Sequence, residues 1–321
     1  MDGIDSGNKI IIMSQDKIEE EADVLSCCAC CGKAEIDDIK LKECDDCFLV
    51  KYCSDECRNN HKSEHEQECK KRAAELRDEL LFKQPEESYL GDCPICSLPL
   101  PIDLQKSSLM TCCSKIICNG CRVANLIRES DMRLQHTCPF CREPIPELEE
   151  ENEKFQLKRI QANDPVAICH EGGERHYKGD YEIAFEYWTM AAELGNADAY
   201  YKLALLEEKM QGVEKDEGKY IHNLEEAAIS GHPNARYFLG MHEWNKNGNV
   251  ERAVKHWIIA ATQGDDESMK QLMAQFKEGY VSKDDLASTL RAHKAAVDAT
   301  KSPQRGFTDK FRFGEEEKQS T

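Results

Sequence analysis

Cysteine and histidine side chains with the spacing of metal ligands dominate the first half of the sequence. Seventeen of the eighteen cysteines lie between Cys27 and Cys141, and only Cys169 lies beyond them. The first residues lack a basic stretch followed by a long apolar one, so no secretion signal is expected, and disulfides rarely persist in a reducing compartment. Thiolates in close pairs are ligands that zinc prefers. The cysteines therefore predict zinc sites rather than disulfides.

The first cluster is a series of four close ligand pairs. They are Cys28 and Cys31, Cys44 and Cys47, Cys53 and Cys57, and His65 and Cys69. Each pair supplies two ligands from one turn or helix end, so eight ligands suffice for two tetrahedral ions. Cys27 and Cys30 offer a competing register for the first pair. His61, one helical turn before His65, is expected to be a surface residue, although it is an alternative ligand.

This cluster resembles a MYND finger in three places: the Cys-Gly-Lys that ends at Lys33, the Tyr-Cys that ends at Cys53, and the closing His-x3-Cys. The resemblance implies an interleaved pairing and favours the register that begins at Cys28. Members that bind proline-containing peptides have Gln and Trp where this chain has Arg58 and Lys62, so a different protein ligand is expected. The implied ligand sets are Cys28, Cys31, Cys53 and Cys57 for one zinc, and Cys44, Cys47, His65 and Cys69 for the other.

The second cluster consists of Cys93 and Cys96, Cys112 and Cys113, Cys118 and Cys121, and Cys138 and Cys141. It resembles a RING finger in which cysteine replaces the usual histidine. The adjacent cysteines can bind one ion only with a tight backbone bend. Lys115 stands where the family has histidine, and His136 is an alternative ligand. The cross-brace of the family implies one zinc on Cys93, Cys96, Cys118 and Cys121, and another on Cys112, Cys113, Cys138 and Cys141.

A RING finger acts as a ubiquitin ligase through its surface, because it orients a ubiquitin-charged conjugating enzyme and contributes no covalent catalytic residue. The resemblance implies that Ile95 and Pro139 contact the conjugating enzyme. It also implies that Arg142 reaches both that enzyme and ubiquitin, a task that suits the planar fork of a guanidinium. An inactive, purely structural RING is the alternative.

The second half of the sequence carries a helical repeat. Alanine pairs that end at Ala192, Ala228, Ala261 and Ala296 are spaced by 36, 33 and 35 residues, a period typical of stacked helix pairs. The segments resemble Sel-1-like repeats, relatives of the tetratricopeptide class, over residues 164–298. This resemblance implies that the repeats bind other proteins. The adjacent glycines Gly172 and Gly173 depart from the pattern, so the first repeat is expected to be an imperfect cap.

These patterns divide the chain into zinc-stabilised fingers followed by an all-α solenoid of helical repeats. The expected segments are an acidic disordered lead-in (1–26), a MYND-type finger (27–69), a linker helix (70–88), a RING-type finger (89–146), an acidic linker (147–163), the repeats (164–298) and a disordered tail (299–321).

The net charge of -19 argues against nucleic acid or an anionic membrane as the main partner. No stretch approaches the roughly 18 apolar residues that would span a bilayer. The expected location is therefore the cytoplasm, the nucleus or both.

The leading functional hypothesis is a RING-type ubiquitin ligase that holds four zinc ions, two in each finger. Its expected partners are a ubiquitin-conjugating enzyme, ubiquitin, and a protein substrate or adaptor on the repeats. The alternative is a non-catalytic scaffold or transcriptional adaptor. A methyltransferase is disfavoured because cofactor-binding motifs are missing, and Cys169 beside His170 is interpreted as a core cysteine of the repeats rather than a nucleophile.

Overall fold

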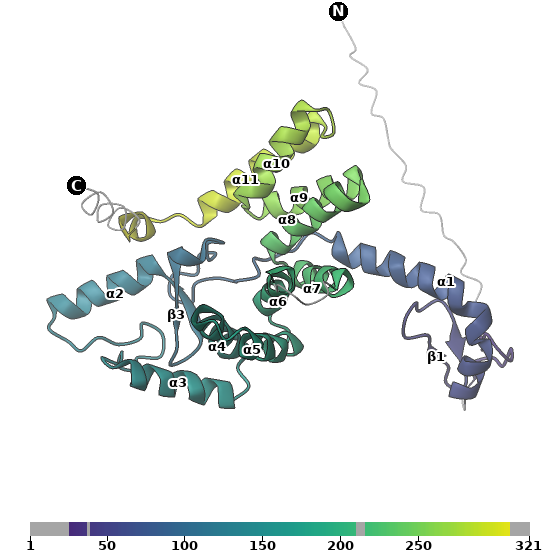
Figure 1. Ribbon diagram of the computed structural model, residues 1–321, viewed down its shortest axis with the longest axis horizontal. Coiled ribbons are helices and arrows are strands. Elements are labelled where there is room, and N and C mark those ends of the chain that lie inside the picture. The colour runs from purple at the N-terminus through teal and green to yellow at the C-terminus, as the bar shows by residue number, and fades with distance from the viewer. Residues whose placement is uncertain (1–25, 37–38, 210–215, 309–321) are drawn as a thin grey trace, which may run out of the picture. The chain divides into compact units, whose positions relative to one another are not determined.

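The computed structural model describes residues 26–36, 39–209 and 216–308. The expected lead-in falls outside the described residues except for Ser26, and so does the tail beyond Thr308. The chain divides into two compact units, Met1–Asp78 and Glu79–Thr321. The architecture is the predicted one, a cysteine-rich zinc-finger region followed by an all-helical solenoid (Figure 1).

The first unit contains a short β-ribbon and the beginning of a long helix. Strand β1 (Lys42–Glu43) pairs antiparallel with β2 (Lys51–Tyr52), and α1 (Asp55–Leu81) follows. Acidic residues in the first turn of α1 favour its start, because they interact well with the positive end of the helix dipole. The helix is continuous over 27 residues. The predicted linker helix is therefore the end of a helix that starts inside the finger.

Most of the buried residues in the core of the first unit are cysteines. Its buried residues are Cys28, Cys44, Cys47 and Tyr52, with Leu41 and Val50 partly buried against them. So small an apolar core cannot offset the conformational entropy lost on folding. The finger therefore needs a further source of stability, which a bound metal supplies in small domains of this kind.

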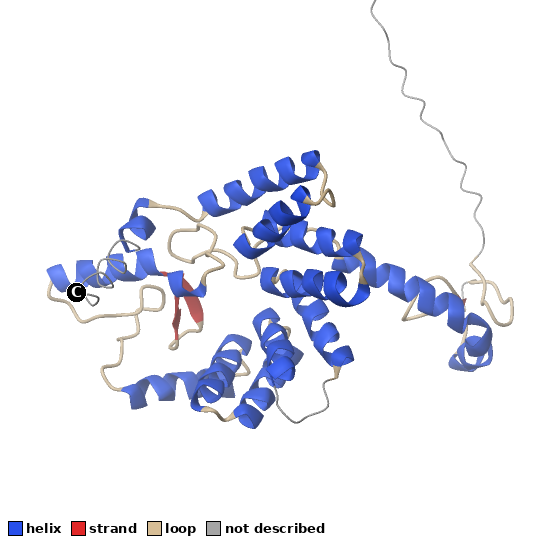
Figure 2. Cartoon of the chain, turned by 45° about the horizontal axis from the view of Figure 1, so that its top comes forward, coloured by secondary structure: helices blue, strands red, loops and turns tan. Residues whose placement is uncertain are grey.

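A second cysteine-rich module opens the second unit. It contains η1 (Leu104–Lys106), the antiparallel hairpin of β3 (Ser107–Met110) and β4 (Lys115–Cys118), and α2 (Asn119–Asp131). Figure 2 shows the two strands of this hairpin in red, surrounded by helices in blue. Leu100, Met110 and Ile117 pack around the buried cysteines. This apolar core is also small, and it surrounds the predicted ligands.

The remaining helices form a linear stack in which each helix packs mainly on its neighbours in the chain. The predicted alanine pairs fall near the ends of α5, α7, α9 and α11, and those of α5, α7 and α9 are buried where helices approach closely. The helices are α3 (Glu149–Gln161), α4 (Pro165–Lys178), α5 (Tyr181–Glu193), α6 (Ala197–Lys209), α7 (Glu217–Ile229), α8 (Pro233–His242), the π-helix η2 (Glu243–Asn247), α9 (Val250–Thr262), α10 (Asp266–Lys277) and α11 (Lys283–Ala299).

Residues 147–163 are not the irregular linker that the acidic composition suggested. They contain α3, which packs on α4. Gln156 is buried and its amide donates to a carboxylate oxygen of Glu171 on α4, while Ile160 packs on the core of the first repeat. The helix therefore covers the first end of the stack, which would otherwise expose apolar surface.

Residues 301–308 also differ from the expected disordered tail. Residues 303–308 form a helical segment, and the side chain of Arg305 is only 7% exposed because it docks on the cysteine-rich module. A buried guanidinium that binds main-chain carbonyls leaves no signal in the local hydrophobic pattern, so the sequence did not indicate this contact.

Gly172, one of the two glycines that depart from the pattern of the first repeat, has a packing role. A Cβ atom at Gly172 would lie 2.5 Å from the indole of Trp188, and one at Gly240 would lie 2.4 Å from the indole of Trp257. The two indole N–H groups donate to the equivalent carbonyls of Cys169 and Tyr237. Gly172 is therefore part of a repeated glycine–tryptophan contact rather than a defect of the pattern.

This contact predicts opposite effects for two neighbouring substitutions. Gly172→Ala is expected to lower the free energy of unfolding by about 1–3 kcal/mol through overpacking against Trp188. Gly173→Ala, at a helical position with nothing within 4 Å of the added atom, is expected to raise it by up to about 1 kcal/mol. Urea denaturation of the two variants measures both changes. Equal effects would contradict the proposed role of Gly172.

The segment that joins α1 to the cysteine-rich module lies along the repeats. Leu81 is buried with Ala204, Leu224 and Ala227, and the ring of Phe82 lies tilted against that of His256 with centroids 4.7 Å apart. Arg236, which is fully buried, donates to the carbonyls of Leu81 and Lys83. Residues before the cysteine-rich module therefore complete the core of the repeats after it.

Candidate metal centres

The structure brings the eight predicted ligands of the first unit together in two groups, in the predicted interleaved pairing. Within each group the ligand atoms lie within 4.8 Å of one another. The end of β2 presents Cys53, and α1 presents Cys57, His65 and Cys69, of which the last two are one turn apart. The groups are Cys28, Cys31, Cys53 and Cys57, and Cys44, Cys47, His65 and Cys69.

The distances between these ligand atoms fit a tetrahedral zinc ion. The Sγ atom of Cys53 lies 3.6 Å from those of Cys31 and Cys57, and the Cys44 and Cys69 sulfurs are 3.7 Å apart. Zn–S bonds of about 2.3 Å place tetrahedral sulfurs about 3.8 Å apart. A disulfide would need about 2.05 Å. The sulfurs are therefore spaced to surround an ion and not to bond to each other.

The spare residues of this cluster lie outside both groups. Cys28 and Cys31 belong to the first group and Cys27 and Cys30 to neither, so the structure uses the register of Cys28 and Cys31. The Nδ1 atom of His61 lies 3.1 Å from the Tyr52 hydroxyl, and its ring stacks on that of His65. His61 therefore supports the ring of a candidate ligand, a role that position alone did not predict.

The second unit brings its eight predicted cysteines together in the cross-braced arrangement. The Cys96 and Cys118 sulfurs are 3.9 Å apart, those of Cys113 and Cys138 also 3.9 Å, and those of Cys112 and Cys141 3.4 Å. The groups are Cys93, Cys96, Cys118 and Cys121, and Cys112, Cys113, Cys138 and Cys141.

A tight turn lets the adjacent cysteines face one site. The carbonyl of Met110 accepts hydrogen bonds from the amides of Cys113 and Ser114, and Ser114 has a positive φ of 55°. His136, the alternative ligand, instead lies 3.5 Å from Glu129, and the Lys115 ammonium lies over the ring of Phe140. The bend that the sequence required is thus present, and both cysteines are available.

Four of the ligand pairs share one turn that sequence spacing did not reveal. In the Cys-x2-Cys turns that begin at Cys28, Cys44, Cys93 and Cys138, the residue after the second cysteine has a positive φ, and its amide donates to the carbonyl of the first cysteine. These residues are Gly32, Phe48, Ser97 and Arg142. Only one is glycine, so residue type alone could not mark the turn.

Backbone amides in these turns favour thiolates. Burial raises the thiol pKa of Cys28, Cys44 and Cys93, yet hydrogen bonds from backbone amides outweigh it and lower the pKa to about 6, about 7 and about 7. Hydrogen bonds that the Cys53 thiol donates to the sulfurs of Cys31 and Cys57 instead stabilise its protonated form and raise its pKa to about 12. The thiols of one group therefore cannot all ionise without a cation, and a divalent ion removes that obstacle.

The three predicted contact residues of the second module are placed differently from one another. Ile95 is 42% exposed and Arg142 is exposed, whereas Pro139 is buried beside Cys138. The prediction that Pro139 offers a contact surface is therefore wrong, because this ring packs inward. Phe140, the next residue, is 44% exposed.

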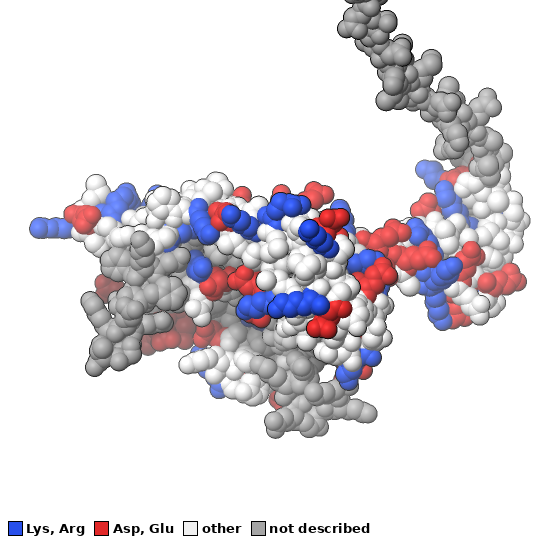
Figure 3. All heavy atoms as spheres, turned by 90° about the horizontal axis from the view of Figure 1, so that it is seen from above, with Lys and Arg blue, Asp and Glu red and all other residues white. Residues whose placement is uncertain are grey.

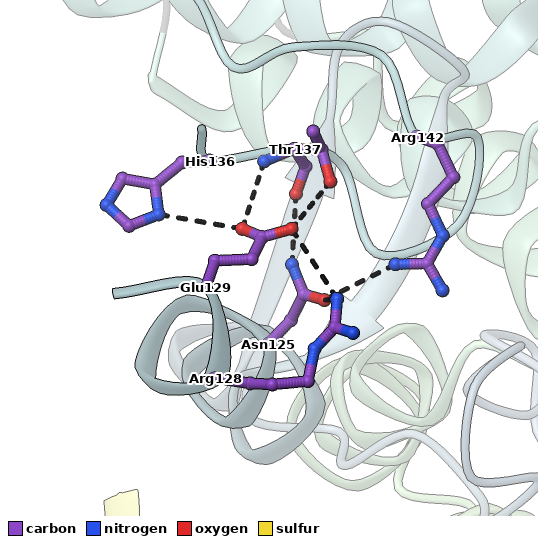
Figure 4. A network of polar contacts seen from close by, with 6 residues as sticks. All are labelled: Asn125, Arg128, Glu129, His136, Thr137 and Arg142. Atoms are coloured by element: carbon purple, nitrogen blue, oxygen red, sulfur yellow. Dashed lines mark hydrogen bonds and ion pairs between the residues drawn. The ribbon is translucent and has the colours of Figure 1, made fainter. Parts of the chain in front are cut away.

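A polar network attaches the last zinc loop to α2 (Figure 4). Glu129, only 2% exposed, accepts hydrogen bonds from the amide and hydroxyl of Thr137. Although burial raises the pKa of Glu129, these hydrogen bonds lower it to about 2. Asn125 donates to the carbonyl of Thr137 and accepts a hydrogen bond of 3.4 Å from Arg142. Helix α2 thus positions the exposed guanidinium beside the zinc loop.

Other residues singled out in the sequence have structural surroundings. Arg58 pairs with Asp45, and Lys62 is exposed. Cys169 lies in the core of the first repeat, where burial raises the pKa of its thiol. A raised thiol pKa disfavours a nucleophile. In the part of the chain that the structure describes, no helix has the length and apolar character needed to cross a bilayer.

Comparisons with known families agree with these modules. The model of the MYND finger matches residues 28–69, and that of the Sel1 repeat matches 166–196, 197–232 and 233–265. No curated protein matches the chain. The chain contains a MYND finger and three Sel1 repeats. The finger and the further cysteine clusters support zinc binding, and these two kinds of module suggest a protein-interaction scaffold.

Three solved structures with some similarity come from Oxalobacter formigenes, Escherichia coli and Pseudomonas aeruginosa. A Sel1 repeat protein from Oxalobacter formigenes is 27% identical, with a TM-score of 0.40 and coverage of 46% of this chain and 64% of the other. The protective antigen c5321 of uropathogenic Escherichia coli, which has an SLR fold, is 18% identical with a TM-score of 0.39. The match covers 55% of this chain and 37% of the antigen. An immunity protein from Pseudomonas aeruginosa is 20% identical with a TM-score of 0.33. The match covers 48% of this chain and 60% of the immunity protein. The chain thus spans less than two thirds of each.

Proposed function

We propose that this protein is a RING-type ubiquitin ligase, in which the cross-braced module docks a ubiquitin-charged conjugating enzyme and the MYND finger and Sel1 repeats recruit protein partners. The observation that carries the proposal is the pair of exposed residues on that module, Ile95 in the first zinc loop and Arg142 after the last ligand. Apolar surface and a guanidinium on one small rigid module are what such docking requires.

Four zinc ions, one in each group of ligands, are part of the proposal. Zinc would supply folding energy and hold the loops, and no chemical step passes through it. The sixteen ligands would be Cys28, Cys31, Cys53 and Cys57; Cys44, Cys47, His65 and Cys69; Cys93, Cys96, Cys118 and Cys121; and Cys112, Cys113, Cys138 and Cys141.

The protein's own residues would act by orientation. Ile95 would bury its side chain against the conjugating enzyme, and Arg142 would donate hydrogen bonds to that enzyme and to ubiquitin. Among the described residues, Asn125 is the one hydrogen-bond partner of the Arg142 guanidinium, at 3.4 Å. So long a bond restrains the side chain while leaving N–H groups for a partner. Restricting the thioester to reactive poses is the whole of the expected contribution.

The compartment and the remaining partners follow from the same chemistry. Zinc thiolates without disulfides suit a reducing cytoplasm or nucleus. On the face seen in Figure 3, basic and acidic side chains are interspersed and no broad basic patch appears, which supports protein rather than nucleic acid as the partner.

Self-ubiquitination by the zinc-loaded chain, against a panel of conjugating enzymes, tests the proposal. Wild type is expected to build chains, whereas Arg142→Ala and Ile95→Ala are expected to lose most of this activity while retaining their zinc. Lys106→Ala and Leu134→Ala are matched controls, because both positions are exposed on the same module but lie outside the proposed contact surface. Their activity should equal that of wild type.

A non-catalytic scaffold or transcriptional adaptor is the second candidate, and it follows directly from the MYND finger and the repeats. If no conjugating enzyme supports chain formation although four zinc ions are bound, this candidate replaces the ligase. Capture of partners by the finger and the repeats would then be the whole function.

A further inference from the structure

The strongest unassigned contact in the second unit joins its last described residues to the group of Cys93, Cys96, Cys118 and Cys121. Residues 303–308 form a helical segment after α11, and the Ser302 hydroxyl accepts a hydrogen bond from the amide of Arg305. The Arg305 side chain then turns into the cysteine-rich module and is buried there.

Four acceptors surround the Arg305 guanidinium. Nη1 donates to the carbonyls of Pro99 and Thr300, both at 2.7 Å, and Nη2 donates to the carbonyl of Leu98 at 3.1 Å and to Cys96 Sγ at 3.4 Å. A planar fork with several donors suits such a set, and the single ammonium of lysine does not. One side chain thus links the end of α11, the chain after the first zinc loop and a sulfur of the metal group.

No carboxylate in the described part of the chain forms an ion pair with Arg305, so its charge is balanced by other means. The nearest anionic chemistry is that of the metal group, because four thiolates outweigh the two positive charges of a zinc ion. Hydrogen bonds to a ligating sulfur are a recognised means by which surrounding residues orient and tune a site. The contact with Cys96 therefore places Arg305 where it would act on this site.

The same site receives the segment's backbone. Gly120 lies between the ligands Cys118 and Cys121, and a Cβ atom there would lie 2.8 Å from the amide nitrogen of Arg305. Any larger residue would push the segment away. Cys96, Leu98, Pro99 and Gly120, which all contact Arg305, lie in the two segments that carry this one group of ligands.

We propose that Arg305 is a positioning residue of the Cys93, Cys96, Cys118 and Cys121 site, and that docking of residues 301–308 and zinc affinity at this one site strengthen each other. The proposal rests on zinc being bound there, as proposed above, and is independent of ligase activity. Linkage requires the effect to be reciprocal: metal at this site holds the segment, and the docked segment holds the metal.

Metal affinity measured site by site tests the proposal on the full chain. Competition with a chromophoric chelator is expected to show one of the four zinc ions bound about 10- to 100-fold more weakly in Arg305→Ala, the size typical for loss of such a supporting contact. Arg305→Lys should recover only part of that loss. Arg291→Ala, at an exposed position on α11, is the matched control and should bind like wild type.

Cadmium NMR of the substituted protein distinguishes positioning from simple packing. Arg305→Ala and Gly120→Ala are both expected to shift the resonance of one all-cysteine site and to leave the others in place. Unchanged resonances with unchanged metal affinity, or an equal weakening of all sites, would overturn the proposal. If wild type itself holds fewer than four ions, the four-site proposal fails instead, and total metal content shows this separately.

Discussion

Removal of zinc is expected to unfold the first unit and the cross-braced module while helices α3–α11 stay folded. The cores of both fingers consist largely of cysteine sulfur, with few apolar side chains around it. Zinc binding releases about 10–16 kcal/mol in isolated zinc-finger peptides, far more than such cores can supply. The repeats hold continuous apolar clusters built from Trp, Leu and Ala side chains, and these contain no predicted ligand.

Far-ultraviolet circular dichroism before and after chelation measures the expected difference. Most of the helical signal should remain, because most helical residues lie in α3–α11, and a cooperative thermal transition should persist. Loss of the entire helical signal would mean that the repeats cannot fold without the metal-bound modules.

Single cysteine substitutions in the first finger provide a matched control for chelation. Cys28→Ser removes a buried predicted ligand and is expected to release one zinc ion and unfold the finger. Cys30→Ser changes an exposed cysteine outside both groups and should leave the metal content unchanged. The reverse result would mean that the competing register is used.

Replacement of Arg236 by methionine is expected to lower the free energy of unfolding of the second unit by about 2–4 kcal/mol. Arg236 donates to the main-chain carbonyls of Leu81 and Lys83, and its replacement leaves the buried Leu81 carbonyl and the partly buried Lys83 carbonyl without this donor. Burial lowers the pKa of the Arg236 guanidinium to about 10, which shows that the buried charge is unfavourable. No carboxylate in the described chain pairs with it, so removing the charge recovers part of the lost free energy of unfolding. The orphaned carbonyls outweigh that gain because each costs about 1–3 kcal/mol.

Urea denaturation followed by tryptophan fluorescence measures the loss, since Trp257 lies in the adjoining core. Limited proteolysis should also show new cleavage after Lys83, where the segment detaches from α8. Arg291→Met, an exposed arginine on α11, is the control for the loss of charge and should change neither measurement. A stability equal to wild type in Arg236→Met would show that the segment is held by Leu81 and Phe82 alone.

The features that could be predicted from the sequence are those with local periodicity. Ligand pairs recur at fixed spacing because one turn presents both side chains, and the alanine pairs recur because each repeat makes the same close helix contact. Both patterns can be recognised in a single sequence without knowledge of the fold. The interleaved ligand sets came only from the family resemblances, because spacing alone does not say which pairs meet.

The features that could not be predicted depend on contacts between distant residues. The acidic composition of residues 147–153 hid α3, whose packing depends on Gln156 and Ile160 rather than on an obvious apolar face. Arg305 binds carbonyls more than 200 positions earlier in the chain, and any residue type presents the same carbonyl. Pro139 seemed exposed because its position in the motif says nothing about which way its ring packs.

The placement of Leu81 and Phe82 bears on how this combination of modules can change during evolution. Both residues belong to the core of the repeats, yet they precede the cross-braced module in the chain. Repeat proteins ordinarily gain or lose whole modules by recombination at the boundaries between modules. Here a cut anywhere between residues 83 and 164 would separate the repeats from part of their own interior. The cross-braced module is therefore enclosed within the solenoid's sequence, and the two are expected to be inherited together.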